Sequence, residues 1–422
     1  MKRSYPSISR RAVAATAVVA AVVALAGCGG SGDAGSDEPL QFFLSGDANQ
    51  GGGYAHMAEK YEQETGVEVE IVDIAHEDLP TKLRNAAQAG DLPALARTSM
   101  DPVWRNAATD LTDITEGSGI RTELSDWDGD KVISLPSDIT AVGLFLNKTL
   151  FDEAGVAYPT GDDDIWTWDE YVAAVKEVQK ATDASYGMVM DKSAHRLKAL
   201  LYEFGSEYFQ ADAEGTFRSN ADTKRALEFF KDLNDDSFMP RSVWLSDADG
   251  NALFKSGDVV SYVSGSWQIA DFAVNITDFD WVSVPMPTDK QRSTHYSTAA
   301  SIVVFDGPQR EAAHDFVKWL YEPENYTELS EVSSFIPAVD GLDINYASNA
   351  EAIDVYNRDI AASPAIVGDI TAKEFQYSAQ GVKTEGDPVR DETVKYLNGE
   401  QSVDETIAKI NETFTDQLGA LE

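Results

Sequence analysis

The chain is poor in cysteine, because its 422 residues include only Cys28, close to the N-terminus. A single cysteine cannot form a disulfide within the chain, and it cannot supply a zinc site built from several thiolates. If Cys28 is itself modified, the rest of the chain has no thiol that could act as a nucleophile. The sequence therefore excludes a disulfide framework. If Cys28 is modified, it also excludes catalysis by a cysteine.

Basic residues are also scarce, with 33 Lys and Arg against 72 Asp and Glu and a formal charge of −39. Four cations and no acidic residue precede Cys28, so cleavage before it would take the charge to −43. Such a surface repels nucleic-acid phosphates and anionic lipid headgroups. We expect no nucleic-acid partner and no membrane contact except through an anchor, and we expect most acidic side chains simply to keep the surface solvated.

The apolar run Ala12–Ala26 has fifteen small or aliphatic residues, fewer than the roughly 20 that a membrane-spanning helix needs. It follows the four cations Lys2, Arg3, Arg10 and Arg11, an arrangement typical of a secretory signal peptide. We therefore expect residues 1–27 to be a signal peptide, with an uncleaved membrane anchor as the alternative. The pair Arg10-Arg11 leaves both the general secretory and the twin-arginine export routes open.

The motif Leu25–Cys28 (Leu-Ala-Gly-Cys) resembles the bacterial lipobox, in which the cysteine becomes the new N-terminus and carries acyl chains. Two or more chains anchor a protein stably, so the resemblance implies lipidation of Cys28 and a place on the extracellular face of the cell membrane. Residues 28–39 are rich in Gly, Ser and acids and are predicted to be a flexible tether.

The apolar pattern after the tether predicts an α/β fold. Leu40–Leu44 is typical of a buried strand, apolar residues recur at helical spacing from Tyr54 to Tyr61 before a C-capping Gly66, and Val67–Val72 alternates as a second strand. A strand, helix and strand in succession indicate a parallel α/β unit.

Three further helices have clear start or stop signals. Capping boxes at Thr167–Glu170 and Ser402–Glu405 each open a helix, and Pro308–Tyr321 is predicted to be a helix that Pro323 stops. About 395 residues after cleavage, with 43% apolar content, are enough for two hydrophobic cores.

Short motifs spaced along nearly all of the mature chain resemble those of one family. In chain order they are Phe43–Asp47, Tyr61–Val67, Leu135–Asp138, Gly143–Lys148, Leu150–Gly155, Trp166–Tyr171, Phe254–Asp258, Gly265–Trp267, Val284–Pro287 and Ala313–Leu320. The set resembles the extracellular solute-binding proteins of ABC importers, in the carbohydrate-binding family that includes the maltose-binding proteins. It departs from that family at Gly90–Leu95, where an acid usually follows the proline, and this loosens the register around Asp101.

The resemblance implies a periplasmic-binding-protein-like α/β fold of two lobes, with the ligand cleft between them and three hinge crossings. We place the crossings near Ser137–Thr140, Ser283–Pro287 and Ile336–Gly341. Lobe 1 would then comprise residues 40–138 and 285–338, and lobe 2 residues 139–284 and 339–422.

The resemblance also implies a function. The protein would capture a neutral oligosaccharide and deliver it to the permease of an ABC transporter, as a monomer without cofactor, metal or catalytic activity. Lobe closure around the ligand would be the signal that the permease reads, because a ligand that contacts both lobes favours the closed form.

A sugar site needs flat aromatic rings and convergent hydrogen-bonding groups in a cleft. Trp267, after Gly265 and Ser266 at a presumed strand end, is the first stacking candidate, with a core tryptophan as the alternative. Ser266 is a further ligand-binding candidate. Asp138, at the first crossing, either binds the ligand as in the family or is an ordinary turn residue.

Other candidates come from strand ends and from family position. Asp47 and Asn49 follow the first strand, at the edge where α/β sheets bind ligands. Asp101 and Trp104 could supply a carboxylate and an aromatic platform. Weaker candidates are Glu77, His76, His295 and Tyr296.

Other classes of function remain as alternatives. A surface glycoside hydrolase would need a carboxylate pair, which cannot be picked out among 72 acids. A binding protein for peptides or amino acids would need a cation for the ligand carboxylate, and Arg84, Arg97, Arg105 or Lys192 could serve. The Gly51–Gly53 run lacks a nucleotide-binding pattern, and Asp247–Asn251 has its glycine too early for an EF-hand.

Overall fold

The first elements of the chain form as their apolar pattern predicts. In the computed structural model, β1 (Leu40–Leu44) and β2 (Val69–Asp73) pair in parallel and flank α1 (Gly53–Thr65). α1 ends where Gly66 adopts a φ of 78°, a left-handed conformation that glycine reaches without steric cost. The predicted strand, helix, strand unit is confirmed.

The structure describes residues 38–48, 51–76, 78–161, 164–246, 248–298, 300–380, 382 and 386–421. The expected signal peptide, Cys28 and the tether up to Asp37 lie outside these residues. Within the described ranges, no helix is both long and apolar enough to cross a lipid bilayer.

The first lobe is built on a sheet with the strand order β2-β1-β3-β14-β6, in which β3 is Leu95–Thr98, β14 is Ser301–Val304 and β6 is Leu135–Pro136. β3 runs parallel to β1, whereas β14 pairs antiparallel with β3 and β6. Successive β1 residues enter two different clusters, Phe42 with Tyr54 and Phe43 with Trp104. The sheet is therefore packed on both faces, as expected of a largely parallel sheet.

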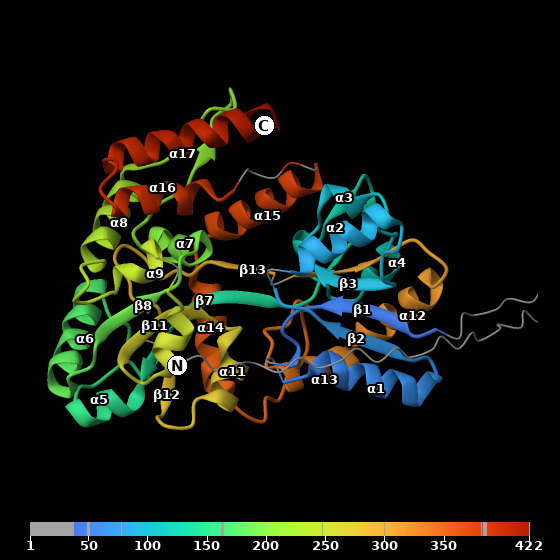
Figure 1. Ribbon diagram of the computed structural model, residues 1–422, viewed down its shortest axis with the longest axis horizontal. Coiled ribbons are helices and arrows are strands. Elements are labelled where there is room, and N and C mark those ends of the chain that lie inside the picture. The colour runs from blue at the N-terminus through green and yellow to red at the C-terminus, as the bar shows by residue number, and fades with distance from the viewer. Residues whose placement is uncertain are drawn as a thin grey trace, which may run out of the picture. The chain divides into compact units, whose positions relative to one another are not determined.

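Helices of the first lobe cover this sheet (Figure 1). They are α1, α2 (Leu79–Ala89), α3 (Pro102–Arg105), α4 (Thr112–Thr115), α12 (Arg310–Leu320) and α13 (Pro323–Ser333). The predicted helix is confirmed as α12, which ends before Pro323, and this proline has a second role. It opens α13 at the first helical position, where the missing proline N–H is not needed.

The second lobe is built on a sheet with the order β12-β7-β11-β8, comprising β12 (Trp281–Val284), β7 (Ile139–Asn147), β11 (Val259–Gly265) and β8 (Tyr186–Met190). β11 is parallel to β8 and antiparallel to β7. All nine residues of β7 are buried. Val142 and Phe145 on β7 pack into two different clusters, so this sheet also has two covered faces.

Helices surround the second sheet and continue beyond it (Figure 1). They are α5 (Lys148–Ala154), α6 (Trp168–Thr182), α7 (Ala194–Glu203), α8 (Ala221–Leu233), α9 (Arg241–Leu245), α10 (Gly250–Lys255), α11 (Gln268–Asn275), α14 (Ala350–Ala362), α15 (Ala365–Ala379), α16 (Pro388–Leu397) and α17 (Val403–Leu418). Both predicted capping boxes are confirmed, at the starts of α6 and α17.

Short elements complete the described chain. They are the turns η2 (Thr122–Leu124) and η3 (Gly419–Leu421), the ribbon of β4 (Trp127–Asp128) with β5 (Lys131–Val132), the ribbon of β9 (Gln210–Ala211) with β10 (Phe217–Arg218), and β13 (Tyr296–Thr298), which pairs with the first half of β7.

The chain passes between the two sheets in three places. It leaves the first lobe between β6 and β7, returns between β13 and β14, and leaves again between α13 and α14, which packs on β7 and β12. The return lies later than the crossing expected near Ser283–Pro287. The reason is that Tyr296–Thr298 pairs with β7 and Met286 lies in the core of the second lobe.

Candidate functional site

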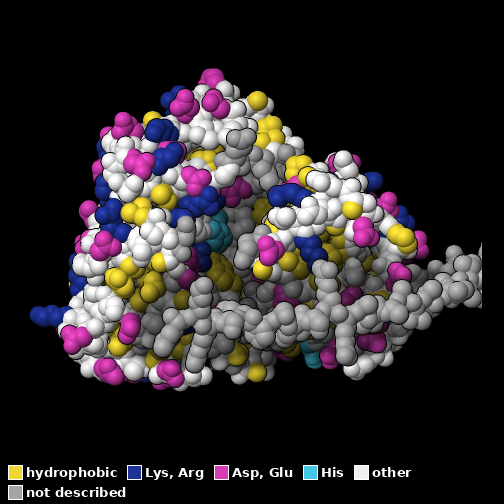
Figure 2. Space-filling view, viewed as in Figure 1, with side chains coloured by type: hydrophobic (Ala, Val, Ile, Leu, Met, Phe, Trp, Pro, Cys, Tyr) yellow, Lys and Arg dark blue, Asp and Glu magenta, His cyan; other side chains and the backbone are white. Residues whose placement is uncertain are grey.

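A cavity of about 950 Å³ is lined by residues of both lobes. In the first lobe, its wall follows the carboxyl ends of β1, β2 and β3, at Ser45, His76 and Ser99 among others. In the second lobe, it follows the ends of β8 and β11. Open α/β sheets bind ligands at this edge of their strands, so we call this cavity the cleft and treat it as the candidate site. Figure 2 shows a hollow on this face with histidine and basic side chains beside it.

Trp267 lies in the cleft wall, half-buried, two residues after the end of β11. A Cβ atom on Gly265 would lie 2.1 Å from Cζ3 of the Trp267 ring, so only glycine allows the ring to sit there. The Arg196 guanidinium carbon lies 5.0 Å from the Trp267 ring centroid, and the His195 ring centroid lies 5.7 Å from it. The structure therefore places the first stacking candidate in the cleft, as expected.

In the part of the chain that the structure describes, three arginines line the cleft, and each has a carboxylate partner. Arg97 binds Asp138 at 2.8 Å, Arg84 binds Asp101 at 3.0 Å, and Arg196 binds Asp191 at 2.7 Å. Ion pairs of this kind remove most of the net charge that the cleft would otherwise present to a ligand.

Asp138 and Asp47 do not line the main cleft. Asp138 is buried and accepts hydrogen bonds from Arg97 and, at 2.5 Å, from Ser137 Oγ. It lines a separate, small cavity of about 10 Å³ beside Trp267. Asp47 accepts from the backbone N–H groups of Tyr54 at 2.9 Å and Ala55 at 3.1 Å, and burial raises its pKa. Both carboxylates thus have structural partners.

Asp101 and Trp104 both line the cleft, as expected from their family position. Asp101 caps α3 by accepting from the N–H of Val103 at 3.0 Å, in addition to its pairing with Arg84. Trp104 is 1% exposed and packs in a core cluster, so only part of its ring reaches the cavity.

The remaining candidates are dispersed. Ser266 accepts from the N–H of Ala141 at 3.2 Å and lines the small cavity with Trp267. His295 is 1% exposed and lies behind His195, with ring centroids 4.4 Å apart. Tyr296 belongs to β13 and is half-buried outside the cleft lining. Asn49, Glu77 and Cys28 lie outside the described residues.

His195 and Arg196 were missed by the sequence reasoning. They lie in the first turn of α7, shortly after β8. The signal available in the sequence was a helix start that closely follows a strand. Burial, together with the nearby charges of Lys198 and Arg196, lowers the pKa of His195 to about 3. Its imidazole is therefore neutral at physiological pH. Among the described residues, no group of three or more His, Cys, Asp or Glu is placed to hold a metal ion.

Comparison with known proteins gives a family match over most of the chain. The model of the family described as bacterial extracellular solute-binding protein matches residues 56–352. A binding protein of Brucella abortus (strain 2308) is 25% identical over 272 residues, 61% of this chain and 62% of that protein. A lactose-binding protein of Rhizobium radiobacter is 28% identical over 211 residues, 47% of this chain and 48% of its own length. The chain thus spans about three fifths and about half of these relatives.

Solved structures confirm the two-lobe α/β fold. The GacH receptor of Streptomyces glaucescens, solved without ligand and with acarbose, superposes with a TM-score of 0.70 at 21% identity, over 90% of this chain and 98% of that one. Maltose-bound MalE3 of T. maritima gives a TM-score of 0.68 at 15% identity, over 90% and 100% of the two chains.

Proposed function

The chain belongs to the bacterial extracellular solute-binding protein family, and from this membership we propose that it captures a neutral oligosaccharide and delivers it to the permease of an ABC transporter. The observation that carries the proposal is the composition of the cleft. Its three arginines are each paired with a carboxylate, and Trp267 forms part of its wall. A neutral, hydroxyl-rich ligand with an apolar ring face suits such a wall better than an ion does.

Two relatives support a sugar as the ligand. One is named as a lactose-binding protein, and an arabinooligosaccharide-binding protein of Bacillus subtilis is 30% identical over 112 residues. The peptide alternative is less favoured, because Arg84 and Arg97 would have to give up Asp101 and Asp138 to bind a ligand carboxylate.

We further propose that the connections between β6 and β7, β13 and β14, and α13 and α14 act as the hinge. A ligand touching Trp267 from one lobe and Ser99 from the other would bind the closed form more tightly and shift the population toward it. The protein would act by binding alone, without catalysis. Lipidation at Cys28 would hold it on the extracellular face of the membrane.

Calorimetry of the chain with neutral di- to tetrasaccharides tests the proposal. We expect micromolar or tighter binding, about −8 kcal/mol or stronger, and no release of new reducing ends. Trp267→Ala should weaken that binding at least about thirtyfold, since truncating an aromatic anchor commonly costs about 2 kcal/mol or more. Trp127→Ala is the matched control, because Trp127 is 38% exposed and is not a lining residue of the described cleft.

One outcome would refute the proposed function, and another would refute the role of Trp267 in it. Heat with peptides and none with any neutral glycan would identify a different ligand class. A Trp267→Ala protein that melts far lower than wild type, yet binds sugar normally when folded, would make Trp267 a core residue instead.

A further inference from the structure

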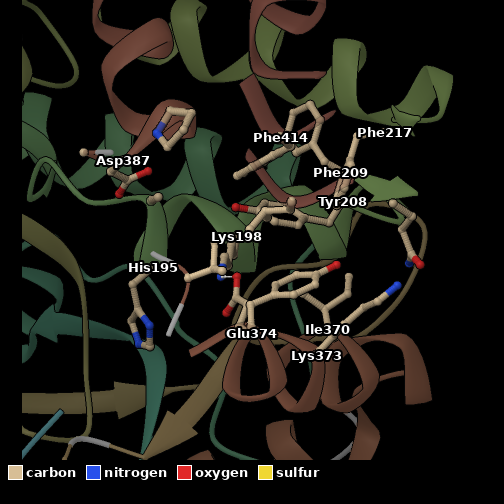
Figure 3. Close-up of a pocket in the computed structure, with 17 residues that line it drawn as sticks. His195, Lys198, Tyr208, Phe209, Phe217, Ile370, Lys373, Glu374, Asp387 and Phe414 are labelled. Atoms are coloured by element: carbon tan, nitrogen blue, oxygen red, sulfur yellow. Dashed lines mark hydrogen bonds and ion pairs between the residues drawn. The ribbon is translucent and has the colours of Figure 1, made fainter. Parts of the chain in front are cut away.

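A second cavity, of about 480 Å³, lies within the second lobe. Among the described residues, Tyr377 of α15 lines it together with four further aromatic rings, those of Tyr208, Phe209, Phe217 and Phe414, each at most 8% exposed. Figure 3 shows these four rings on one side and α15, with Ile370 and Glu374, on the other. We call this cavity the aromatic pocket.

The charged groups on the wall of the aromatic pocket already have partners. Lys198 Nζ pairs with Glu374 and lies 5.0 Å from the centroid of the Tyr208 ring. Figure 3 shows the two side chains pointing toward each other. Asp387 accepts from the N–H of Arg390 at 3.1 Å, and burial raises its pKa. The wall therefore offers an occupant rings and aliphatic groups more than free charge.

The aromatic pocket is partly open, so the chain itself does not close over its apolar wall and an occupant can enter. Its volume is within the range of small-molecule sites. Aromatic rings at its wall would pack against a planar apolar group by stacking or edge-to-face contact.

The aromatic pocket adjoins the cleft through one residue. His195 lines both cavities, and Lys198, three residues later on the same face of α7, lines the aromatic pocket. The Nε2 atom of His195 is buried and has no hydrogen-bond partner among the described residues. Since His195 is shared by the two cavities, a ligand that extends from the cleft into the aromatic pocket would contact this residue.

We infer that the aromatic pocket receives the apolar aglycone of a glycoside whose sugar lies in the cleft. The preferred ligand would be a sugar that carries an aromatic or compact hydrocarbon group, rather than a plain oligosaccharide. This inference rests on the proposed function for the sugar half of the ligand, whereas the pocket itself can be probed without any sugar.

The test compares matched pairs in calorimetry on the full chain. Maltose, lactose and cellobiose are each measured beside their 4-nitrophenyl glycosides. For the sugar that binds, we expect the aryl glycoside to bind at least about tenfold tighter, a gain of about 1.4 kcal/mol. The fluorescence of 8-anilinonaphthalene-1-sulfonate serves as the sugar-independent probe of the pocket.

Two variants fill the pocket from opposite walls, Ile370→Trp on α15 and Leu418→Trp on α17. Each should abolish the aryl gain and the dye signal and leave the affinity for the free sugar within about twofold of wild type. Val274→Trp is the matched control, because Val274 is 69% exposed on α11. Melting curves show whether Ile370→Trp or Leu418→Trp fails to fold. If one of them does, the test uses the other.

The possible results separate the two proposals. Equal affinities for sugar and aryl glycoside, or an aryl gain that persists in both folded variants, overturn the inference and leave the sugar function standing. Dye binding that both filled variants lose, in a chain that binds no sugar or glycoside, supports an apolar site in the pocket and refutes the sugar function instead.

Discussion

Arg97 and Asp138 form an ion pair across 2.8 Å, with side chains that are only 5% and 4% exposed. Arg97 Nε also donates to Ser137 Oγ at 3.0 Å, and the guanidinium carbon lies 5.5 Å from the centroid of the Phe335 ring. Arg97 belongs to β3 of the first lobe, whereas Asp138 lies in the connection to β7. The pair therefore ties the first-lobe sheet to the segment where the chain first passes between lobes.

Breaking this pair from the arginine side should destabilise the protein strongly. Arg97→Met leaves the Asp138 carboxylate buried without its cation, and losing one partner of a buried pair costs about 3 to 5 kcal/mol. The double variant Arg97→Met with Asp138→Leu should recover most of that loss, since no isolated charge remains. Unfolding in urea measures both values.

Arg84→Met is the matched control for this prediction. Its partner Asp101 is also buried, but Arg84 is 45% exposed, and water can replace much of the interaction. We expect a loss of at most about 1 kcal/mol. An equal loss of unfolding free energy in Arg97→Met and Arg84→Met would show that burial of the arginine does not determine the size of the loss.

Local signals in the sequence sufficed for elements whose partners are near in the chain. The capping boxes at Thr167 and Ser402 each involve residues three positions apart, and both were predicted correctly. A cleft position was expected for Trp267 because Gly265 and Ser266 precede it at the end of a strand, and the glycine is what admits the ring. Its contact with a ligand stays a prediction.

Features that depend on distant residues could not be predicted in the same way. The sequence identifies Asp138 as a carboxylate at a crossing. Whether that carboxylate can bind a ligand depends on its pairing with Arg97, which lies 41 residues earlier. The position of the second crossing depends on whether Tyr296–Thr298 pairs with β7, which no local pattern encodes. The aromatic pocket joins Tyr208 to Phe414, two residues that only the packing of α17 brings together.

Gly265→Ala should weaken sugar binding by displacing Trp267. The new methyl group would lie 2.1 Å from the Trp267 ring and 2.6 Å from the carbonyl oxygen of Ala141, so both the ring and the backbone must shift. We expect at least about a tenfold loss of affinity, 1.4 kcal/mol, and a lower melting temperature.

The control for Gly265→Ala is Gly161→Ala, because a Cβ at position 161 meets nothing within 4 Å. That variant should bind sugar and melt like wild type. Unchanged affinity in Gly265→Ala, measured by calorimetry on folded protein, would mean that the position of the Trp267 ring does not matter for the ligand.

Cys28→Ala should release the protein from the membrane and leave sugar binding unchanged. The expected lipid is attached to Cys28, and the cleft is built wholly from residues beyond the tether. Cell fractionation followed by a high-salt wash measures the release. A variant that stays with the membrane through that wash would contradict lipidation at Cys28.

Glu203 should make the stability of the second lobe fall as the pH rises. Its side chain is fully buried, Oε2 accepts from Trp168 Nε1 at 2.8 Å, and Oε1 has no hydrogen-bond partner among the described residues. Burial raises the pKa of Glu203 well above its ordinary value of 4.5, and the charge of Asp359 adds to this effect. Above pH 4.5 the folded chain therefore holds this proton more tightly than the unfolded chain does, so stability declines until the folded-state pKa is passed.

Glu203→Gln tests this reasoning, because the amide can still accept from Trp168 but does not titrate. Between pH 5 and pH 9, the free energy of unfolding of the variant should decline less steeply than that of wild type, and the variant should be the more stable protein at the alkaline end. Glu62→Gln, on the exposed face of α1, should keep the wild-type slope. Urea unfolding at each pH gives the slopes. A Glu203→Gln slope that matches wild type would mean that Glu203 is already ionised in the folded protein, and that the hydrogen bond from Trp168 outweighs its burial.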